Sequence, residues 1–576
     1  MFQPEGKAPR PAEERTGALD SNRLGLVVLG AAMVASATLL LWLERGITFM
    51  VDEWSWVNRA ATGSLVELLH PINQHLLLVP LLTAKGLLAA WGLSLVPFEL
   101  AQVAGILACS GVVYAFSRRR VGPILALAPA MVPLFLGSSY SVLMQTLLGV
   151  QGIYVLVFGI GALLAIERNT KGGDVAACAL LTLALASFSS GLAFVAGVAV
   201  AVLLSDNRLR RSYVWIVPLF LYVAYRLWAL QFGSGGGPQL ANVPALPFYF
   251  VDSIAASATA LFGREALVGK GPGASLFVSG FDLDQAMAAL FFAALEVGAI
   301  VFAARRLVRR GPIPVTLWST LAVPIALWLT QGLVLDSVRM PGENRYLYAG
   351  AVVLTLAAVE LARNVRLSRL GVAAVLGLTA VAIAGNAPRF EEGRAGIVYH
   401  ATRARAYTGV MDLDGRHAPD PSYIPANDLD LGAGAGALWI TVGGYLELSE
   451  RYGPFGDSPR QILEQDEEIR HGADLVAVSM LDLRLTPAAG LPDRGCFRAA
   501  PASAGELVVL PRGGAVLQAS GDTPVELRRF AARGAVPLGD LAANRPAQLA
   551  VPADRARPWE LWARRPVTLT VCPLPG

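Results

Sequence analysis

Two adjacent carboxylates, Asp52 and Glu53, follow an apolar run that ends at Leu43, and Trp54 comes directly after them. A carboxylate at the mouth of a dry cavity can act as a general base, and a neighbouring one can bind the second substrate or a divalent ion. We therefore predict Asp52 and Glu53 as catalytic residues and Trp54 as an accessory residue. Binding of Mg²⁺ or Mn²⁺ by this pair stays open. The structural alternative is that acidic residues and tryptophans flank the outer end of a spanning helix.

A second polar cluster runs from His70 to His75, directly before another apolar run, in a chain that has only five histidines. An imidazole at the entry to a membrane segment can orient a substrate or move a proton. We predict His75 as a catalytic residue, and His70 and Asn73 as accessory residues. The structural alternative is that Asn73 caps the following helix.

A third cluster lies between two later apolar runs and holds Arg339, Arg345 and Tyr346. A pair of guanidinium groups at a membrane surface is suited to a phosphate or diphosphate. Tyr346 can supply a stacking or hydrogen-bonding edge. We predict these three residues as a phosphate site, and the alternative is that the arginines contact lipid headgroups by snorkelling.

The composition tells us which class of protein positions these residues. Of 576 residues, 54% are apolar and only 16% are charged, whereas soluble domains are about 25% charged. Together with a mean hydropathy of +0.52, this excludes an ordinary soluble protein and a disordered chain. The net charge of +4 gives no indication of a nucleic-acid partner. We expect a polytopic α-helical membrane protein in the lipid bilayer.

The apolar runs divide the chain into three parts. We predict a disordered cytoplasmic tail over 1–23, a transmembrane domain over 24–385 and an extracytoplasmic β-rich domain over 386–576. Short alternating stretches at 438–442 and 567–571 predict strands in the last part. Ser458-Pro459 predicts a helix near 458–470. Cys496 and Cys572 also lie there, and an extracytoplasmic location makes a disulfide between them plausible.

Arginine clusters predict the orientation of the spans. They occupy alternate loops, and cytoplasmic loops carry the excess of Lys and Arg, which predicts that the N-terminus is inside and the C-terminal domain outside. Two full spans between the first external loop and Arg118 would put that cluster outside. We therefore expect a short re-entrant or surface helix within 70–96, and the alternative is a further span that the apolar runs do not reveal. The expected total is 11 to 13 spans. The clusters are Arg118–Arg120, Arg208–Arg211, Arg305–Arg310 and Arg363–Arg369.

A cytoplasmic N-terminus, one span and an Asp-Glu pair in the first external loop resemble the GT-C superfamily of polyprenyl-phosphate-sugar-dependent glycosyltransferases. His70-Pro71 is similar to the start of the His-Pro-Pro motif of the protein mannosyltransferase and aminoarabinose transferase branch, with Ile72 in place of the second proline. Arg345-Tyr346 is similar to an Arg-Tyr element that some branches place near the donor phosphate.

The resemblance implies an inverting glycosyltransferase in the bacterial cytoplasmic membrane. It would move a sugar from a polyprenyl-phosphate donor to a hydroxyl of an envelope glycan, lipid or protein. Asp52 would take the acceptor proton, Glu53 and His75 would orient the acceptor or hold a metal, and the arginines would bind the donor phosphate. The alternatives are a lipid-linked sugar flippase or transporter and a non-enzymatic envelope scaffold.

Overall fold

The computed structural model describes residues 12–233, 237–264, 314–336, 339–425, 438–492, 495–499, 507–553 and 557–574, with side chains from residue 21 on. They belong to two compact units. The first comprises Met1–Arg45, Ser64–Leu87 and Ser94–Ala395, and the second comprises Gly46–Gly63, Leu88–Leu93 and Gly396–Gly576. The predicted loop cluster Arg305–Arg310 lies outside the described residues.

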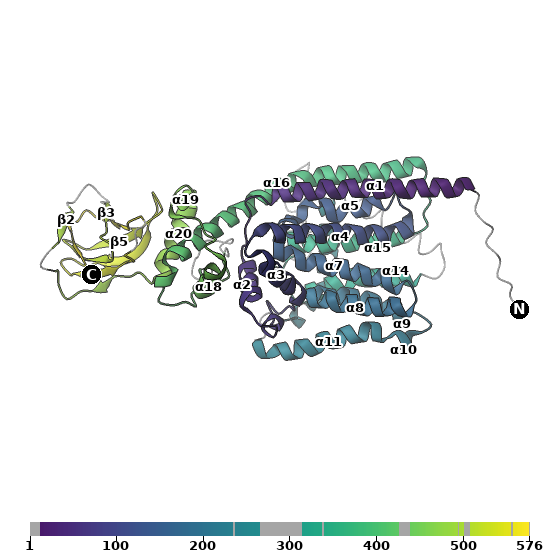
Figure 1. Ribbon diagram of the computed structural model, residues 1–576, viewed down its shortest axis with the longest axis horizontal. Coiled ribbons are helices and arrows are strands. Elements are labelled where there is room, and N and C mark those ends of the chain that lie inside the picture. The colour runs from purple at the N-terminus through teal and green to yellow at the C-terminus, as the bar shows by residue number, and fades with distance from the viewer. Residues whose placement is uncertain are drawn as a thin grey trace. The chain divides into compact units, whose positions relative to one another are not determined.

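The first unit is a bundle of apolar helices that lie side by side (Figure 1). Helix α1 begins within the segment predicted as a disordered tail, and α16 runs through the predicted domain boundary at residue 385 into the second unit. The helices are α1 (Ala12–Leu43), α3 (Leu78–Trp91), α4 (Leu95–Val121), α5 (Leu127–Phe135), α6 (Tyr140–Met144), α7 (Thr146–Ile166), α8 (Lys171–Ser187), α9 (Leu192–Leu203), α10 (Arg208–Arg211), α11 (Tyr213–Ala229), α12 (Leu246–Ala260), α14 (Val315–Gly332), α15 (Asn344–Leu361) and α16 (Arg369–Asp414), with short 3-10 turns η1 (Glu67–Leu69), η2 (Gly137–Ser139), η3 (Ser189–Gly191), η4 (Leu230–Phe232) and η5 (Leu240–Ala245).

Among the described residues, five helices are long and apolar enough to cross a membrane, and the bent pair α5–α6 would make a sixth. The expected total of 11 to 13 spans therefore stays a prediction. Helix α3 has 14 residues, which at 1.5 Å per residue is about 21 Å, less than the roughly 30 Å of a hydrocarbon core. This length agrees with the expectation of a short helix within 70–96, and whether that helix is re-entrant or lies at the membrane surface stays a prediction.

Exposed apolar side chains identify the surface that faces lipid. Val34 on α1, Phe220 on α11 and Val381 on α16 are each more than 60% exposed. Helices α4 and α7, by contrast, are largely buried. Since large exposed apolar surfaces are not stable in water, α1, α11 and α16 form the periphery of the bundle and α4 and α7 form its centre.

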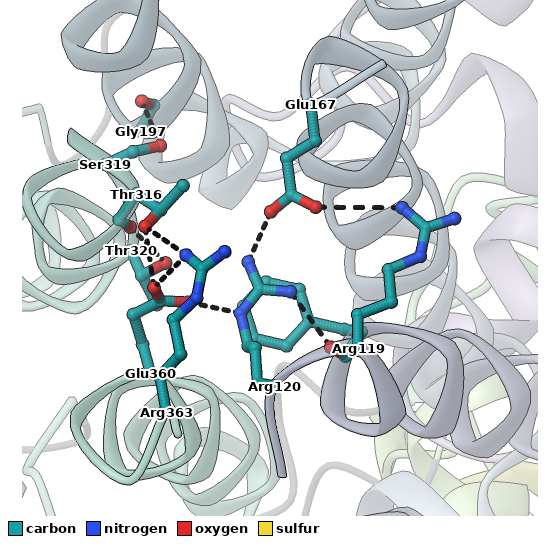
Figure 2. A network of polar contacts seen from close by, with 10 residues as sticks. Arg119, Arg120, Glu167, Gly197, Thr316, Ser319, Thr320, Glu360 and Arg363 are labelled. Atoms are coloured by element: carbon teal, nitrogen blue, oxygen red, sulfur yellow. Dashed lines mark hydrogen bonds and ion pairs between the residues drawn. The ribbon is translucent and has the colours of Figure 1, made fainter. Parts of the chain in front are cut away.

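A buried ionic network ties four helices together at one end of the bundle (Figure 2). The Arg120 guanidinium on α4 pairs with Glu360 on α15 and with Glu167 just after α7. Glu360 also accepts hydrogen bonds from Thr316 on α14, at 2.6 Å, and from Arg363, at 3.0 Å. The side chains of Arg120 and Glu360 are only 3% and 1% exposed. Their charges are therefore compensated within the protein rather than by water.

This network brings together arginine clusters that lie far apart in the sequence. Arg211 pairs with Asp174 at 2.6 Å and donates to the Ile166 carbonyl at 3.2 Å. The next residue of the chain, Glu167, binds Arg120. The described arginine-rich loops thus gather at a single end of the bundle, which we call the arginine end. The sequence pattern predicted that these arginine-rich loops lie on the same side of the bundle, and the described loops do so.

In its described residues, the second unit contains four α-helices, the ends of α3 and α16, the 3-10 turn η7 (Gly415–His417) and two antiparallel sheets. The helices are α2 (Asp52–Thr62), α18 (Val442–Tyr452), α19 (Pro459–Leu463) and α20 (Glu467–Met480). The first sheet has the order β1-β7-β4-β9-β2 and the second β3-β8-β5-β6. The strands are β1 (Thr486–Pro487), β2 (Phe497–Ala499), β3 (Leu507–Val509), β4 (Gly514–Ala519), β5 (Thr523–Arg528), β6 (Val536–Leu541), β7 (Ala547–Ala550), β8 (Glu560–Ala563) and β9 (Leu569–Pro573).

The strands begin at Thr486, so the β-rich region is shorter than predicted and helices precede it. The strand predicted at 438–442 is wrong. The Thr441 hydroxyl accepts a hydrogen bond from the Gly444 amide and caps α18, which begins at Val442. The strand predicted at 567–571 is confirmed as β9. The helix expected near 458–470 begins as predicted, at a capping box on Ser458, but α19 ends at Leu463 and a separate helix, α20, begins at Glu467. Cys496 and Cys572 form a disulfide.

Buried polar contacts join the helices of the second unit to its sheets. Arg529, just after β5, forms a 2.7 Å ion pair with Asp414 at the end of α16, and both side chains are fully buried. Asp474 on α20 accepts hydrogen bonds from the amides of Arg529, Phe530 and Ala531 at 2.8–3.1 Å. Burial nevertheless raises the pKa of Asp474 to about 6. The loop after β5 is therefore fixed to both helices.

The ionic network should contribute strongly to the stability of the bundle. In Glu360→Ala, the buried charge of Arg120 loses its main partner, and breaking a buried pair costs about 3–5 kcal/mol. The control Arg119→Gln removes an ion pair whose arginine is 44% exposed, and such pairs contribute about 0–1 kcal/mol. Unfolding of the purified protein by SDS in mixed micelles should separate the two variants. Equal midpoints would show that the network is not stabilising.

Candidate functional site

His75, the histidine predicted to be catalytic, lies in a tight turn at the end of the first unit that is opposite the arginine end. Ile72 and His75 exchange two backbone hydrogen bonds of 3.1 and 2.8 Å. Between them, Asn73 and Gln74 have φ of 46° and 67°. Such two-residue turns suit Asn and Gly, whereas left-handed backbone at Gln is strained. Because Asn73 lies five residues before α3, which begins at Leu78, Asn73 does not cap that helix, and that alternative is wrong.

The imidazole of His75 is held from two sides. Its Nδ1 lies 2.7 Å from the Oγ of Ser189 in η3, within hydrogen-bond distance. Its ring packs on Phe188, with the centroids 4.0 Å apart. The break between α8 and α9 thus supplies both contacts. This leaves the other ring nitrogen, Nε2, outside the hydrogen bond with Ser189.

Arg226, in the last turn of α11, holds the same turn of the chain. Its guanidinium donates to the main-chain carbonyl of Gln74 and lies 3.5 Å from the Gln74 side-chain oxygen. Among the described residues, no carboxylate lies within ion-pair distance of Arg226. The positive charge of Arg226 is therefore not balanced by a direct ion pair in the part of the chain that the structure describes.

Arg339, in the loop before α15, is the second arginine whose charge lowers the pKa of His75. Burial, together with the charges of Arg226 and Arg339, lowers the pKa of His75 to about 4. His75 is therefore neutral at pH 7. Arg339 pairs with Asp336 at 3.0 Å, and these side chains are 34% and 39% exposed. The charged groups that shift His75 are both cations.

Arg339 also links the second and third predicted clusters. Its charge reaches the Tyr346 hydroxyl as well as His75. Arg345 is exposed in the first turn of α15, with its guanidinium 5.1 Å from the Tyr346 ring centroid. Segments 70–75 and 339–346 are thus within electrostatic reach of each other. We call Arg226, Arg339, Arg345, His75 and Tyr346 the cationic cluster.

The remaining predicted histidine packs beside this cluster. The His70 ring lies 4.2 Å from that of Phe232 and 5.8 Å from that of Trp228. Both aromatic residues continue from Arg226 along the end of α11 and η4. His70 therefore fixes the η1 turn to α11, and Asn73 is exposed at the tip of the neighbouring turn.

The first predicted cluster belongs to the second unit. Asp52 is half-buried in the first turn of α2, directly after Val51, whose φ is 51°. Glu53 is buried, and its carboxylate accepts a hydrogen bond of 3.2 Å from the main-chain amide of Met50. Trp54 is fully buried against the rings of Phe49, Tyr445 and Phe455, so it packs in the core of this unit.

The described residues do not fit a divalent metal at Asp52 and Glu53. They contain no group of three or more His, Cys, Asp or Glu side chains that could hold an ion together. Glu53, in addition, is engaged by the backbone at the start of α2. Mg²⁺ and Mn²⁺ prefer several oxygen ligands around one ion, so no step of the chemistry is assigned to a metal.

The prediction from the sequence did not include Arg226, Gln74 or Ser189 in the site. Two signals could have identified them. Arg226 is the single charged residue of an apolar run, and intramembrane charges are functional candidates by default. Ser189 lies in a polar break between two apolar runs. Neither signal indicates that these residues meet the turn at 72–75.

No family model and no curated protein matches the sequence. Among solved structures, ArnT from Cupriavidus metallidurans bound to undecaprenyl phosphate matches with a TM-score of 0.40 and 15% identity, over 78% of this chain and 87% of that one. ArnT from the same organism in the apo state matches with a TM-score of 0.32 and 16% identity, over 77% and 91%. Both TM-scores lie below 0.5, so this likeness establishes neither a shared family nor a shared activity.

The lowered pKa of His75 predicts how stability depends on pH. The folded protein holds His75 neutral, with a pKa of about 4 against 6.5 for an ordinary histidine. This contribution is complete above pH 6.5 and is lost as the pH falls toward 4. His75→Gln does not titrate, so its unfolding temperature should fall less over this range. His417→Gln, at an exposed histidine, is the control. A wild-type pH profile in His75→Gln would contradict this assignment.

Proposed function

We propose that the chain is a GT-C-type glycosyltransferase that moves a sugar from a polyprenyl-phosphate donor to an acceptor hydroxyl, with inversion at the anomeric carbon. The observation that supports this most directly is the cationic cluster. Two segments predicted separately from the sequence, 70–75 and 339–346, contribute to it. A phosphate group is the natural counter-ion for several guanidinium groups in one place.

The position of the cluster along the helices also supports a lipid-linked donor. Arg345 lies in the first turn of α15, whereas Arg363 of the ionic network follows the last turn. Eighteen residues of helix separate these ends by about 27 Å. The cluster and the arginine end therefore lie near the two surfaces of a membrane. If the arginine end is cytoplasmic, as the positive-inside rule predicts, the cationic cluster lies on the extracytoplasmic side.

The cluster suits the leaving group of such a transfer. When the sugar leaves, negative charge develops on the phosphate oxygen that was bonded to the anomeric carbon. Fixed cations and the N-terminus of α15 stabilise that charge. Arg339 and Arg345 bind the donor phosphate in this proposal, with Tyr346 beside them.

The general base of the proposal is Asp52, and this assignment rests on the sequence. Its carboxylate takes the proton of the acceptor hydroxyl as the oxygen attacks the anomeric carbon. Glu53 and His75 orient the acceptor. The acceptor is a hydroxyl of an envelope glycan, lipid or protein. The C-terminal domain is extracytoplasmic in this proposal, and the membrane is the bacterial cytoplasmic membrane.

Arg345→Gln should reduce turnover while the protein still folds, because Arg345 is exposed. Loss of one group that stabilises developing charge typically lowers kcat about 10²–10³-fold. The assay is transfer of radiolabelled sugar in proteoliposomes from a panel of polyprenyl-phosphate-linked hexoses and pentoses. Arg210→Gln, at an exposed arginine of the arginine end, is the control. A flippase would move the lipid across the bilayer without forming glycosylated product, so absence of product for every donor would favour that alternative.

Asp52→Asn tests the base separately. The variant keeps the size and polarity of the side chain but cannot accept the acceptor proton, so transfer should fall about 10²–10⁴-fold. Binding of the donor should stay within about twofold of wild type, because a general base acts mainly in the transition state. Asp206→Asn, at an exposed aspartate, is the control. Near-normal transfer by Asp52→Asn would remove Asp52 from the mechanism.

A further inference from the structure

The surroundings of His75 carry more positive charge than the described residues neutralise. Arg226 approaches from α11 and Arg339 from the loop before α15, and both act on His75. Asp336 pairs with Arg339, which leaves the charge of Arg226. The other neighbours, Ser189, Phe188 and the hydrogen-bond partner of Ser189 on α11, Tyr222, supply no carboxylate. A partly buried charge without a counter-ion is costly, so this arrangement is suited to an anionic ligand.

The turn at 72–75 fixes the two groups that would meet such a ligand. Arg226 uses one N–H on the Gln74 carbonyl, and a guanidinium has further N–H groups to offer. His75 uses Nδ1 on Ser189, which leaves Nε2 for another partner. The left-handed backbone at Asn73 and Gln74 holds both contacts in place. Strained backbone of this kind is typical of sites that are organised before a ligand arrives.

We propose that Arg226 and His75 form a subsite for the second negative charge of a phosphate monoester, and that His75 takes up a proton when this dianion binds. The inference rests on the proposed function, because the ligand is the lipid phosphate released by sugar transfer. Beyond the proposed function, the subsite predicts a difference in affinity: the protein should bind the released phosphate monoester more tightly than a phosphate diester of the donor type.

The reaction itself changes the charge that the subsite meets. In the donor, the phosphate is a diester with one negative charge. During transfer, the bond between the anomeric carbon and the phosphate oxygen breaks, and its electron pair stays on that oxygen. The acceptor oxygen forms the new bond to the anomeric carbon, and the acceptor proton goes to the base. The phosphate is then a monoester that can carry two negative charges.

Proton uptake follows from the charges around His75. In the described residues, its charged neighbours are the cations Arg226 and Arg339, which together with burial keep the imidazole neutral. A bound dianion reverses the sign of the local potential and stabilises the imidazolium form. The released lipid phosphate would therefore be held by two arginines and a protonated histidine, whereas the donor diester gains less from this subsite.

The experiment measures binding of two lipids to the full chain in nanodiscs by isothermal titration calorimetry. The lipids are undecaprenyl phosphate, a monoester, and its methyl ester, a diester with the same tail. Titrations at pH 6.5 in two buffers of different ionisation enthalpy report the protons taken up. Wild type should bind the monoester at least about tenfold more tightly, the scale of one hydrogen bond to a charged group, and should take up protons only with the monoester.

Two variants assign the effect to the named groups. Arg226→Gln should lose most of the preference for the monoester, and Arg226→Lys, which keeps the charge, should retain part of it. His75→Gln should abolish proton uptake while part of the preference remains. Arg210→Gln is the control and should behave as wild type. An unchanged preference in Arg226→Gln, or proton uptake that persists in His75→Gln, would overturn the subsite.

Failure of the proposed function gives a different result. If wild type binds neither lipid and transfers no sugar, the glycosyltransferase proposal fails, and the subsite fails with it. If wild type transfers sugar but binds both lipids equally, only the subsite fails. Sugar transfer by wild type is therefore measured on the same preparation.

Discussion

The organising constraint of the first unit is that a charge removed from water needs a counter-charge. At the arginine end the protein supplies it, because Arg120 is enclosed by Glu360 and Glu167. At the other end Arg226 has a carbonyl and an amide oxygen but no carboxylate among the described residues. The two ends of the bundle thus differ in how a single arginine is compensated. Arg120 has carboxylate partners within the protein, whereas the described residues supply none for Arg226.

The sequence predicted the elements that depend on local pattern. Continuous apolar runs marked the helices, and the alternation at 567–571 marked β9. At 438–442 the same reasoning failed, because five residues are too few to separate a strand from the approach to a helix, and the Thr441 cap decides in favour of α18. Short segments are therefore decided by capping and tertiary contacts rather than by their own hydrophobic pattern.

The site could be predicted only in part, for a related reason. Residue types and spacing identified His75 and Arg339 as candidates, but not that they lie within electrostatic reach of each other. Arg226 is 152 positions from Gln74, and Arg120 is 240 positions from Glu360. Pairings over such distances are set by the packing of helices, which a single sequence does not reveal. Trp54 shows the limit of inference from residue type, since it was predicted as an accessory residue and its side chain is buried in an aromatic core.

The strengths of the ion pairs indicate which arginines are available to a ligand. Arg120 and Glu360 are almost fully buried, so separating them would leave two uncompensated charges, and this pair is permanent. Arg339 and Asp336 are each more than a third exposed, and pairs of this kind contribute at most about 1 kcal/mol. A phosphate can therefore displace Asp336 from Arg339 at little cost. Because Arg226 has no carboxylate to release among the described residues, an anion binding there gains that interaction without breaking another ion pair, which makes Arg226 the stronger determinant of the two.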